Sequence, residues 1–304
     1  MADQKRMLLG IEPTCWSNDD FPELGDHIPY QLILEQTHQA GFEGGTTGHN
    51  YPTHLPSLLR AMASQQLKIC STWFGTTFST GVDIDASLAA FTTQVEFLKE
   101  VGAKDVVVAE LANAVNQVKT KAVLTERPVM NEAQWFLVCH LLDEAGRIAR
   151  ENGMALSYHP HVGTVIQTLE ETKRLLESTK SENVGLCLDT GHLRFAGASQ
   201  SDLEELFNKS VDRIRHVHLK NVRREVLPQA VNKKVSFYQA ILAGIFTVPG
   251  DPEGDIDFRP FLQTLQKAGY ERWLVVEAEQ NPDKADPLMY AQIARTYLRS
   301  ELGY

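Results

Sequence analysis

Short apolar segments alternate with amphipathic segments along the whole chain. Between the apolar segments, hydrophobic residues recur at helical spacing, as at Leu88, Phe91, Val95 and Leu98. Glycines such as Gly41 stand where a helix would stop. The apolar segments recur roughly every 30 residues, which is the size of a strand–helix unit. The predicted strands lie at residues 7–11, 41–47, 68–74, 105–110, 154–159, 184–189, 214–220 and 273–279.

Eight strand–helix units favour an α/β fold of the (β/α)8 type, the TIM barrel, over an open doubly wound sheet. No linker divides the 304 residues, so we predict one domain over residues 1–304. Neither a GxGxxG motif after the first strand nor a GxxxxGK[ST] motif is present, so no dinucleotide or P-loop site is indicated. The long irregular segments 113–131 and 221–257, the second with a helix near 235–242, are expected at the catalytic mouth.

Charge and composition narrow the possible partners and the compartment. The net charge of −10 opposes a nucleic-acid partner, because acidic surfaces repel phosphate backbones. No apolar stretch approaches the ~18 residues of a membrane span. The four cysteines lie far apart in the sequence, which fits a reducing compartment. We therefore expect a cytoplasmic protein that acts on small molecules.

Titratable residues gather where four consecutive strands end. Active sites of barrels lie at the carboxyl ends of the strands, and the face under the helices must be apolar. Because side chains alternate along a strand, polar residues on the other face point into the barrel. Glu110 also ends a strand, but alternation there leaves its direction open. The residues predicted to point inward are His159, His161, Asp189, His216, His218, Lys220, Glu277 and Glu279.

A divalent cation would offset the cost of burying such a cluster. We predict His159, Asp189, His218 and Glu277 as its ligands, one from each of four adjacent strands. Mixed nitrogen and oxygen ligands suit Mn, Co, Fe or Zn better than Ca. A single strand-end histidine or aspartate is more often a cap or a hydrogen-bond partner, but four together indicate a site. His192 either reaches this site or caps the next helix.

The loop after the first strand offers groups for a polyhydroxylated ring. Trp16 supplies an apolar face, and Asn18 supplies an amide. Trp73, near the end of the third strand, could form a second wall. The alternative is that residues 17–19 are an N-cap cluster that starts a short helix.

Several motifs resemble those of bacterial inosose dehydratases (2-keto-myo-inositol dehydratases). These are Trp-Ser-Asn-Asp-Asp at 16–20, Tyr-His-Pro-His-Val-Gly-Thr at 158–164 and Phe-Thr-Val-Pro-Gly-Asp at 246–251. Asp-Thr-Gly-His at 189–192 and His-Val-His-Leu-Lys at 216–220 are common to the wider superfamily of xylose isomerase-like sugar isomerases and epimerases. The resemblance covers nearly the whole chain. It implies a metal, Mn or Co in this family, held by the same four strand-end residues.

The resemblance also implies a reaction: loss of water from 2-keto-myo-inositol (scyllo-inosose) to give a trihydroxycyclohexane-1,2-dione in inositol catabolism. A base takes the proton next to the ketone, and an acid protonates the departing hydroxyl. The candidates for these two roles are Glu110, Lys220 and His192, with a lysine pKa depressed by the nearby cation. The residues expected to contact the substrate are Trp16, Asn18, Trp73, His161 and Arg223.

The chain departs from the family pattern at four places. Thr46 and Asn50 stand where an acid and a lysine are usual, and Pro160 and Asn221 replace a histidine and an aspartate. The exact keto-cyclitol or keto-sugar is therefore open. The alternatives are a keto-sugar epimerase or isomerase, an abasic-site endonuclease, and a sugar-binding protein without catalysis. Paired barrels are common in the superfamily, so a homo-oligomer is possible.

Overall fold

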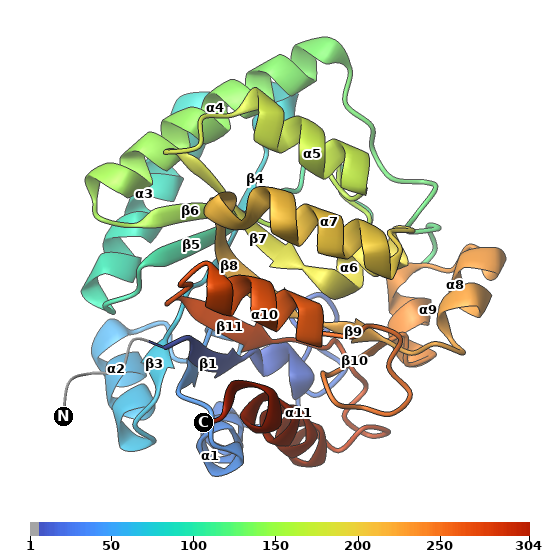
Figure 1. Ribbon diagram of the computed structural model, residues 1–304. Helices are drawn as coiled ribbons and strands as arrows, with labels where there is room; N and C mark the ends of the chain where they lie inside the picture. Colours follow the sequence, from blue (N-terminus) through green and yellow to red (C-terminus); the bar gives the residue numbers. More distant parts are fainter. Residues whose placement is uncertain (1–5) are drawn as a thin grey trace.

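A curled parallel sheet forms the centre of the computed structural model, which describes residues 6–304 (Figure 1). Its strand order is β3-β2-β1-β11-β8-β7-β6-β5-β4, with every neighbouring pair parallel. All eight predicted strand segments are confirmed. The strands are β1 (Leu8–Ile11), β2 (Gly44–Gly45), β3 (Lys68–Ile69), β4 (Trp73–Thr76), β5 (Asp105–Glu110), β6 (Ala155–Tyr158), β7 (Val184–Asp189), β8 (Ile214–Leu219) and β11 (Trp273–Val276).

The third predicted strand is split into β3 and β4, which are the two edges of this sheet. The lower half, β3, pairs with β2, and the upper half, β4, pairs with β5. Between them the Cys70 N–H donates to the Gly45 carbonyl at 3.0 Å, and the Val107 N–H donates to the Thr72 carbonyl at 3.2 Å. The barrel thus closes along a seam where one strand changes partners.

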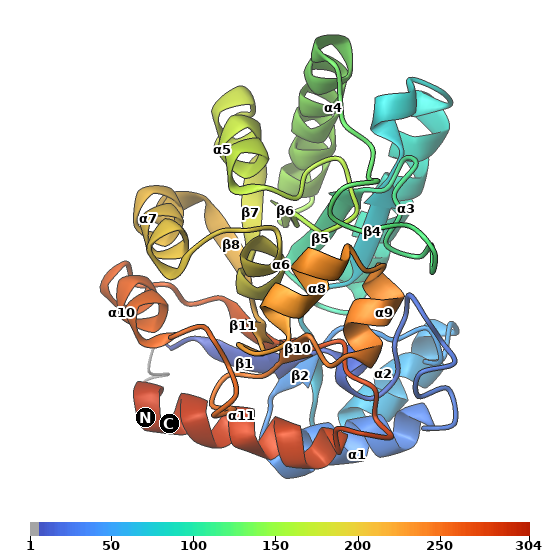
Figure 2. The same ribbon diagram turned by 90° about the vertical axis from the view of Figure 1, so that its right-hand side faces the viewer.

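Helices surround the sheet, as Figure 2 shows from the side of the barrel's mouth. Capping boxes start four helices, at Asn131, Thr168, Ser199 and Ser236. Gly41 ends the first helix in the left-handed conformation, as predicted. The outer helices are α1 (Tyr30–Ala40), α2 (Leu55–Ser64), α3 (Ile84–Glu100), α4 (Glu132–Glu151), α5 (Leu169–Ser178), α6 (Thr190–Phe195), α7 (Gln200–Ser210), α10 (Arg259–Lys267) and α11 (Pro287–Leu302).

The segment between β8 and α10 carries more structure than the sequence indicated. It contains the antiparallel pair β9 (Asn221–Val222) and β10 (Phe246–Thr247), with α8 (Leu227–Lys233) and α9 (Phe237–Leu242) between them. The helix predicted near 235–242 is α9. Short 3-10 turns lie at Pro13–Cys15, Phe78–Thr80 and Val211–Arg213. Across residues 6–304, no helix is both long and apolar enough to cross a membrane.

The alternation of side chains is confirmed on β11. Leu274 and Val276 belong to the large core beneath the outer helices. Trp273 and Val275 belong to a separate cluster with Cys70, inside the barrel. The residues that follow β11 continue the inward row with carboxylates.

Candidate active site

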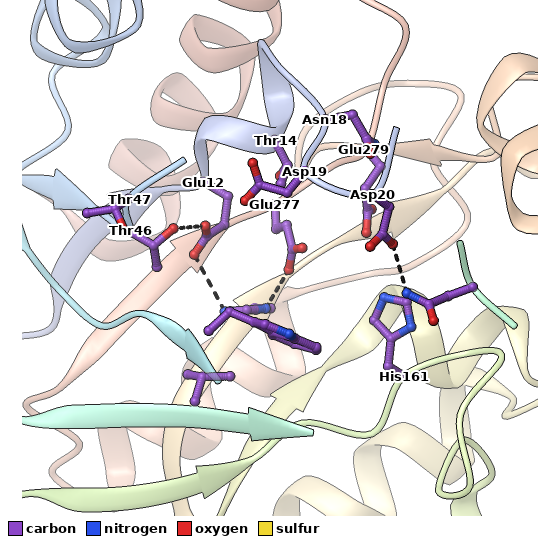
Figure 3. Close-up of a pocket in the computed structure, with 14 residues that line it drawn as sticks. Glu12, Thr14, Asn18, Asp19, Asp20, Thr46, Thr47, His161, Glu277 and Glu279 are labelled. Carbon is purple, nitrogen blue, oxygen red and sulfur yellow. Dashed lines mark hydrogen bonds and ion pairs between the residues drawn. The ribbon is translucent and has the colours of Figure 1, made fainter. Parts of the chain in front are cut away.

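A pocket opens where the strands end, and its empty space is about 700 Å³ when the open solvent at its mouth is included. Figure 3 shows the side chains of Glu12, Glu277 and Glu279 pointing into it. The residues that line it are Glu12, Thr14, Asn18, Asp19, Asp20, Thr46, Thr47, Trp73, Val107, Asn116, His161, His218, Glu277 and Glu279.

The structure brings the four predicted metal ligands together. One ligand atom from each of His159, Asp189, His218 and Glu277 lies within 4.8 Å of the others, and all four residues are buried. His159 Nε2 lies 3.3 Å from Asp189 Oδ2 and 3.1 Å from His218 Nδ1. His218 Nδ1 also contacts Glu277. The set comes from four neighbouring strands, because β6, β7, β8 and β11 are adjacent in the sheet.

The charges of this set fit a divalent cation. Burial lowers the pKa of His159 to about 4, so its ring is neutral at pH 7 and offers a lone pair. Burial alone would raise the pKa of Asp189, but the Lys220 ammonium and the surrounding histidines together outweigh it and keep the carboxylate ionised. Two ring nitrogens facing each other at 3.1 Å need a proton or a cation between them. Neutral imidazole and carboxylate are ligands that Mn, Co, Fe and Zn accept.

Lys220 lies at the centre of the buried charges. Its Nζ is 2.7 Å from His192 Nε2 and 2.9 Å from Glu279 Oε1. It also lies 3.2 Å from Glu277 Oε1 and 3.3 Å from Asp189 Oδ2. Burial would lower the pKa of Lys220, but these carboxylates outweigh it and raise that pKa. The protein groups around Lys220 therefore raise its pKa, whereas the sequence analysis expected a nearby cation to depress it.

Of the two roles that the sequence left open for His192, the structure supports the first, because the ring reaches the site and the cap of α6 is Asp189. His192 lies in the first turn of α6, and its backbone N–H donates to Asp189 Oδ1 at 2.8 Å. Its ring reaches the site, with its centroid 3.8 Å from that of His161. Burial lowers the pKa of His192 well below its usual value, so the ring is neutral. His161 itself lines the pocket, with Nδ1 bonded to the Val162 carbonyl at 2.7 Å.

Glu110 does not lie in the pocket. Its neighbour Val107 lines the pocket, whereas Val106 and Val108 join the outer core, so Glu110 falls on the outward face. The Thr76 hydroxyl donates to its carboxylate at 2.6 Å. The backbone N–H groups of Phe78 and Ser79 and the Ser79 hydroxyl donate to it as well. Glu110 therefore anchors the 3-10 turn after β4 and does not face the ligand cluster.

Trp16 and Arg223 are also placed away from the pocket. Trp16 is buried in the core, where its indole donates to Gln36 Oε1 on α1 at 2.5 Å. The 3-10 turn at Pro13–Cys15 directs its side chain into the core beneath the helices. Hydrophobic periodicity in the sequence does not predict this turn. The Arg223 guanidinium is held by its own loop region and by α11. It donates to the carbonyls of Gly244 and Phe246 and to the Tyr290 hydroxyl, and pairs with Asp251 and Glu253.

Asn18 and Trp73 line the pocket as the sequence predicted. Asn18 Oδ1 accepts the Phe21 N–H at 2.8 Å. Its buried Nδ2 has no partner among the described residues, so it is free to donate to a ligand. The Trp73 ring is 42% exposed and stands edge-on to His159 and His161, with centroids 5.2 and 5.8 Å away.

The sequence analysis missed Glu12, which lies directly after β1. It is buried, accepts the Thr46 hydroxyl, and places Oε1 3.8 Å from His218 Nε2. Burial raises the pKa of Glu12 to about 7. The same alternation argument would have found it, because Leu9 and Ile11 face the outer core.

Two departures from the family pattern hold loops in place. Asn221 accepts the backbone N–H groups of Val222, Asp255 and Ile256 with one oxygen. Asn50 donates to the Ile28 carbonyl at 3.0 Å. Neither lines the pocket, whereas Thr46 does.

Comparisons with known proteins agree with this geometry. The family model of the xylose isomerase-like TIM barrel matches residues 8–300. An inosose dehydratase of Geobacillus thermodenitrificans is 43% identical over 303 residues, covering 100% of both chains. One from Lacticaseibacillus casei is 39% identical and covers 97% of each chain. Among solved structures, the IolI protein with a bound zinc atom superposes with a TM-score of 0.66 at 17% identity, covering 98% of both chains. An L-ribulose 3-epimerase gives 0.67 at 17% identity, covering 98% of this chain and 95% of that one; both structures share the fold.

Proposed function

The chain belongs to the xylose isomerase-like TIM barrel family and, within it, to the inosose dehydratases, and from this premise we propose its reaction. It removes water from 2-keto-myo-inositol to give a trihydroxycyclohexane-1,2-dione. The observation that carries the proposal is the buried set of four ligands beside a pocket with room for a six-membered ring. The relatives share the whole length of the chain, so the site and its loops are included in the similarity.

We propose that His159, Asp189, His218 and Glu277 hold a divalent ion, Mn or Co. When bound, the ion supplies Lewis-acid stabilisation of the negative charge that develops on the substrate's ketone oxygen. Glu12 faces His218, with its Oε1 3.8 Å from His218 Nε2. Asn18 and Trp73 orient the ring of the substrate, the first by its free amide and the second by its exposed face.

Proton transfer falls to groups that face the pocket and have unusual pKa values. Burial raises the pKa of Glu12 to about 7, so this carboxyl group can give or take a proton near neutral pH, and burial raises the pKa of Glu279 above its usual value. Glu279 is backed by Lys220, which in turn bonds His192. We propose that Glu279, assisted by Lys220 and His192, transfers a proton on one side of the substrate. Glu12 transfers a proton on the opposite side.

The test is turnover of 2-keto-myo-inositol, followed by the ultraviolet absorbance of the dione. The chelated protein should be inactive, and Mn or Co should restore activity. Dione formation by the chelated protein would contradict the metal site. Formation of an epimer without dione would point instead to an epimerase or isomerase on the same ligands.

The acid and base can be separated by solvent exchange in D2O. The variant that lacks the base, Glu12→Gln or Glu279→Gln, should lose deuterium exchange next to the ketone. The variant that lacks the acid should keep exchange while losing dione formation. If both variants keep dione formation, neither carboxyl group is the acid or the base.

A further inference from the structure

A second group of possible ligands lies beside the first. One atom each of His161, His192 and Glu279 lies within 4.8 Å of the others, and all three residues are buried. None of the three belongs to the four-residue cluster. The described contacts place one side chain, Lys220, between the two groups.

The atoms of this second group are all acceptors, and those of His192 and Glu279 face a positive charge. The His161 Nδ1–H donates to the Val162 carbonyl, which leaves Nε2 with its lone pair. His192 Nε2 accepts from the Lys220 ammonium at 2.7 Å. Both oxygens of Glu279 lie 2.9 Å from the same ammonium. Two imidazole nitrogens and a carboxylate are a typical ligand set for Zn or Co.

Lys220 is fixed in this place along its whole length. It is completely buried, and its Cγ lies so close to Gly191 that a Cβ there would come within 2.4 Å. Its Nζ lies 4.9 Å from the centre of the Phe246 ring. The ammonium therefore cannot swing away to admit an ion.

We propose that the Lys220 ammonium occupies the position of a second cation, and that removing it opens a second divalent-metal site made by His161, His192 and Glu279. The wild-type protein then holds one ion, at the four-residue cluster. This inference rests on the proposed function for that first ion. A covalently attached charge cannot dissociate, so turnover should depend on the binding of a single metal ion.

The experiment counts metal ions per chain after chelation, reloading with Co²⁺ and removal of the excess. Wild type should retain about one ion, and Lys220→Ala about two, since three protein ligands with water suffice for such a site. The double variant Lys220→Ala with Glu279→Gln should return to about one. Circular dichroism checks that each variant is folded, and Lys220→Ser replaces Lys220→Ala if the latter does not fold.

Two results would overturn the inference: two ions in wild type, or one ion in a folded Lys220→Ala variant. Glu279→Gln alone gives a further check with the lysine in place. It should keep one ion, and loss of that ion would assign Glu279 to the first site instead. Wild type without any bound ion would contradict the proposed function, which keeps the two failures distinguishable.

Discussion

Asp189 uses its two oxygens for different purposes. Oδ1 accepts the backbone N–H of His192 at the start of α6, and Oδ2 faces His159 and the Lys220 ammonium. The helix cap thus fixes the angle of the carboxylate, and the second oxygen is presented to the ligand cluster. One residue joins the start of a helix to the chemistry of the site.

Asp189→Asn should separate these two roles. Asparagine caps a helix as well as aspartate, so the fold should survive. Loss of the charged ligand should lower turnover at a fixed metal concentration by at least about 100-fold. Activity assays at that metal concentration measure the loss of turnover, and calorimetric titration measures the loss of metal affinity. Asp143→Asn on α4 is the control and should behave as wild type. Full activity of Asp189→Asn would contradict the ligand assignment.

Glu110 should be a stability residue. Glu110→Ala leaves buried donors of the turn after β4 without an acceptor, which should cost about 3 kcal/mol of unfolding free energy. Urea denaturation measures this cost, and kcat of the folded fraction should stay within about threefold of wild type. A large loss of kcat at unchanged stability would instead return Glu110 to the acid–base candidates.

At the scale of elements, two loops that are far apart in sequence meet over the pocket. Asp20, in the loop after β1, accepts hydrogen bonds from Asn116 and Gln117 in the loop after β5, both at 3.0 Å. Lys119 pairs with Glu23 and lies over the Tyr238 ring of α9 at 4.6 Å. The Asp20 bonds hold the first two loops together, and the exposed contacts of Lys119 lie beside them.

Asp20→Ala should loosen this closure. Losing the two bonds should cost about 1 kcal/mol, which corresponds to about a fivefold rise in KM. The melting temperature should barely change, because one bond is exposed and the other is only partly buried. Glu23→Gln is the matched control, since its exposed ion pair with Lys119 contributes little. An unchanged KM in Asp20→Ala would show that the loops do not control access.

His49 links the loop after β2 to the loop after β1 in a pH-dependent way. Its ring nitrogens lie 2.8 Å from Asp19 and 3.2 Å from Asp26. Burial would lower the pKa of His49, but the two carboxylates outweigh it and raise that pKa. A raised pKa means that the stabilisation is full below the unfolded-state value of about 6.5 and is lost as the pH rises through the folded-state value.

The melting temperature of His49→Gln should therefore fall below that of wild type at about pH 6, and the difference should vanish at about pH 9. The effect should stay under about 1 kcal/mol, because the pair is partly exposed. Thermal melts of both proteins across this range measure it. A difference that grows with pH would contradict the assignment.

Strand alternation predicted the ligand cluster because helices cover the outer face of every barrel strand. On β6 and β8 apolar residues alternate with polar ones, and at the ends of β7 and β11 the carboxylates alternate with apolar residues of the outer core, so the inward row could be identified. On β5 the run of apolar residues hides the alternation, and the direction of Glu110 could not be obtained. Trp16 and Arg223 lie in loops, where no period exists, and their positions depend on turns and partners from distant segments.

At the scale of the whole molecule, the metal site should couple binding to stability. Four carboxylates, of Glu12, Asp189, Glu277 and Glu279, are buried around Lys220 and the histidines. A ligand present at about 100 times its Kd stabilises the folded state by about 2.7 kcal/mol.

Adding Mn²⁺ to the chelated protein should therefore raise the melting temperature by about 4 °C. Differential scanning calorimetry measures the shift, and Asp189→Asn should show almost none. An equal shift in both proteins would mean that the ion binds elsewhere.

The seam between β3 and β4 should let one side of the barrel open while the other side stays closed. Thermal opening of a barrel should begin where its strands share the fewest hydrogen bonds, and here one strand divides its bonds between two neighbours. Opening along this line parts Thr46 and Thr47 from Trp73, which form one wall of the pocket. The four ligand-bearing strands lie on the opposite side of the barrel and stay paired. We therefore expect substrate and product to exchange through this part of the pocket wall while the ligand-bearing strands stay paired.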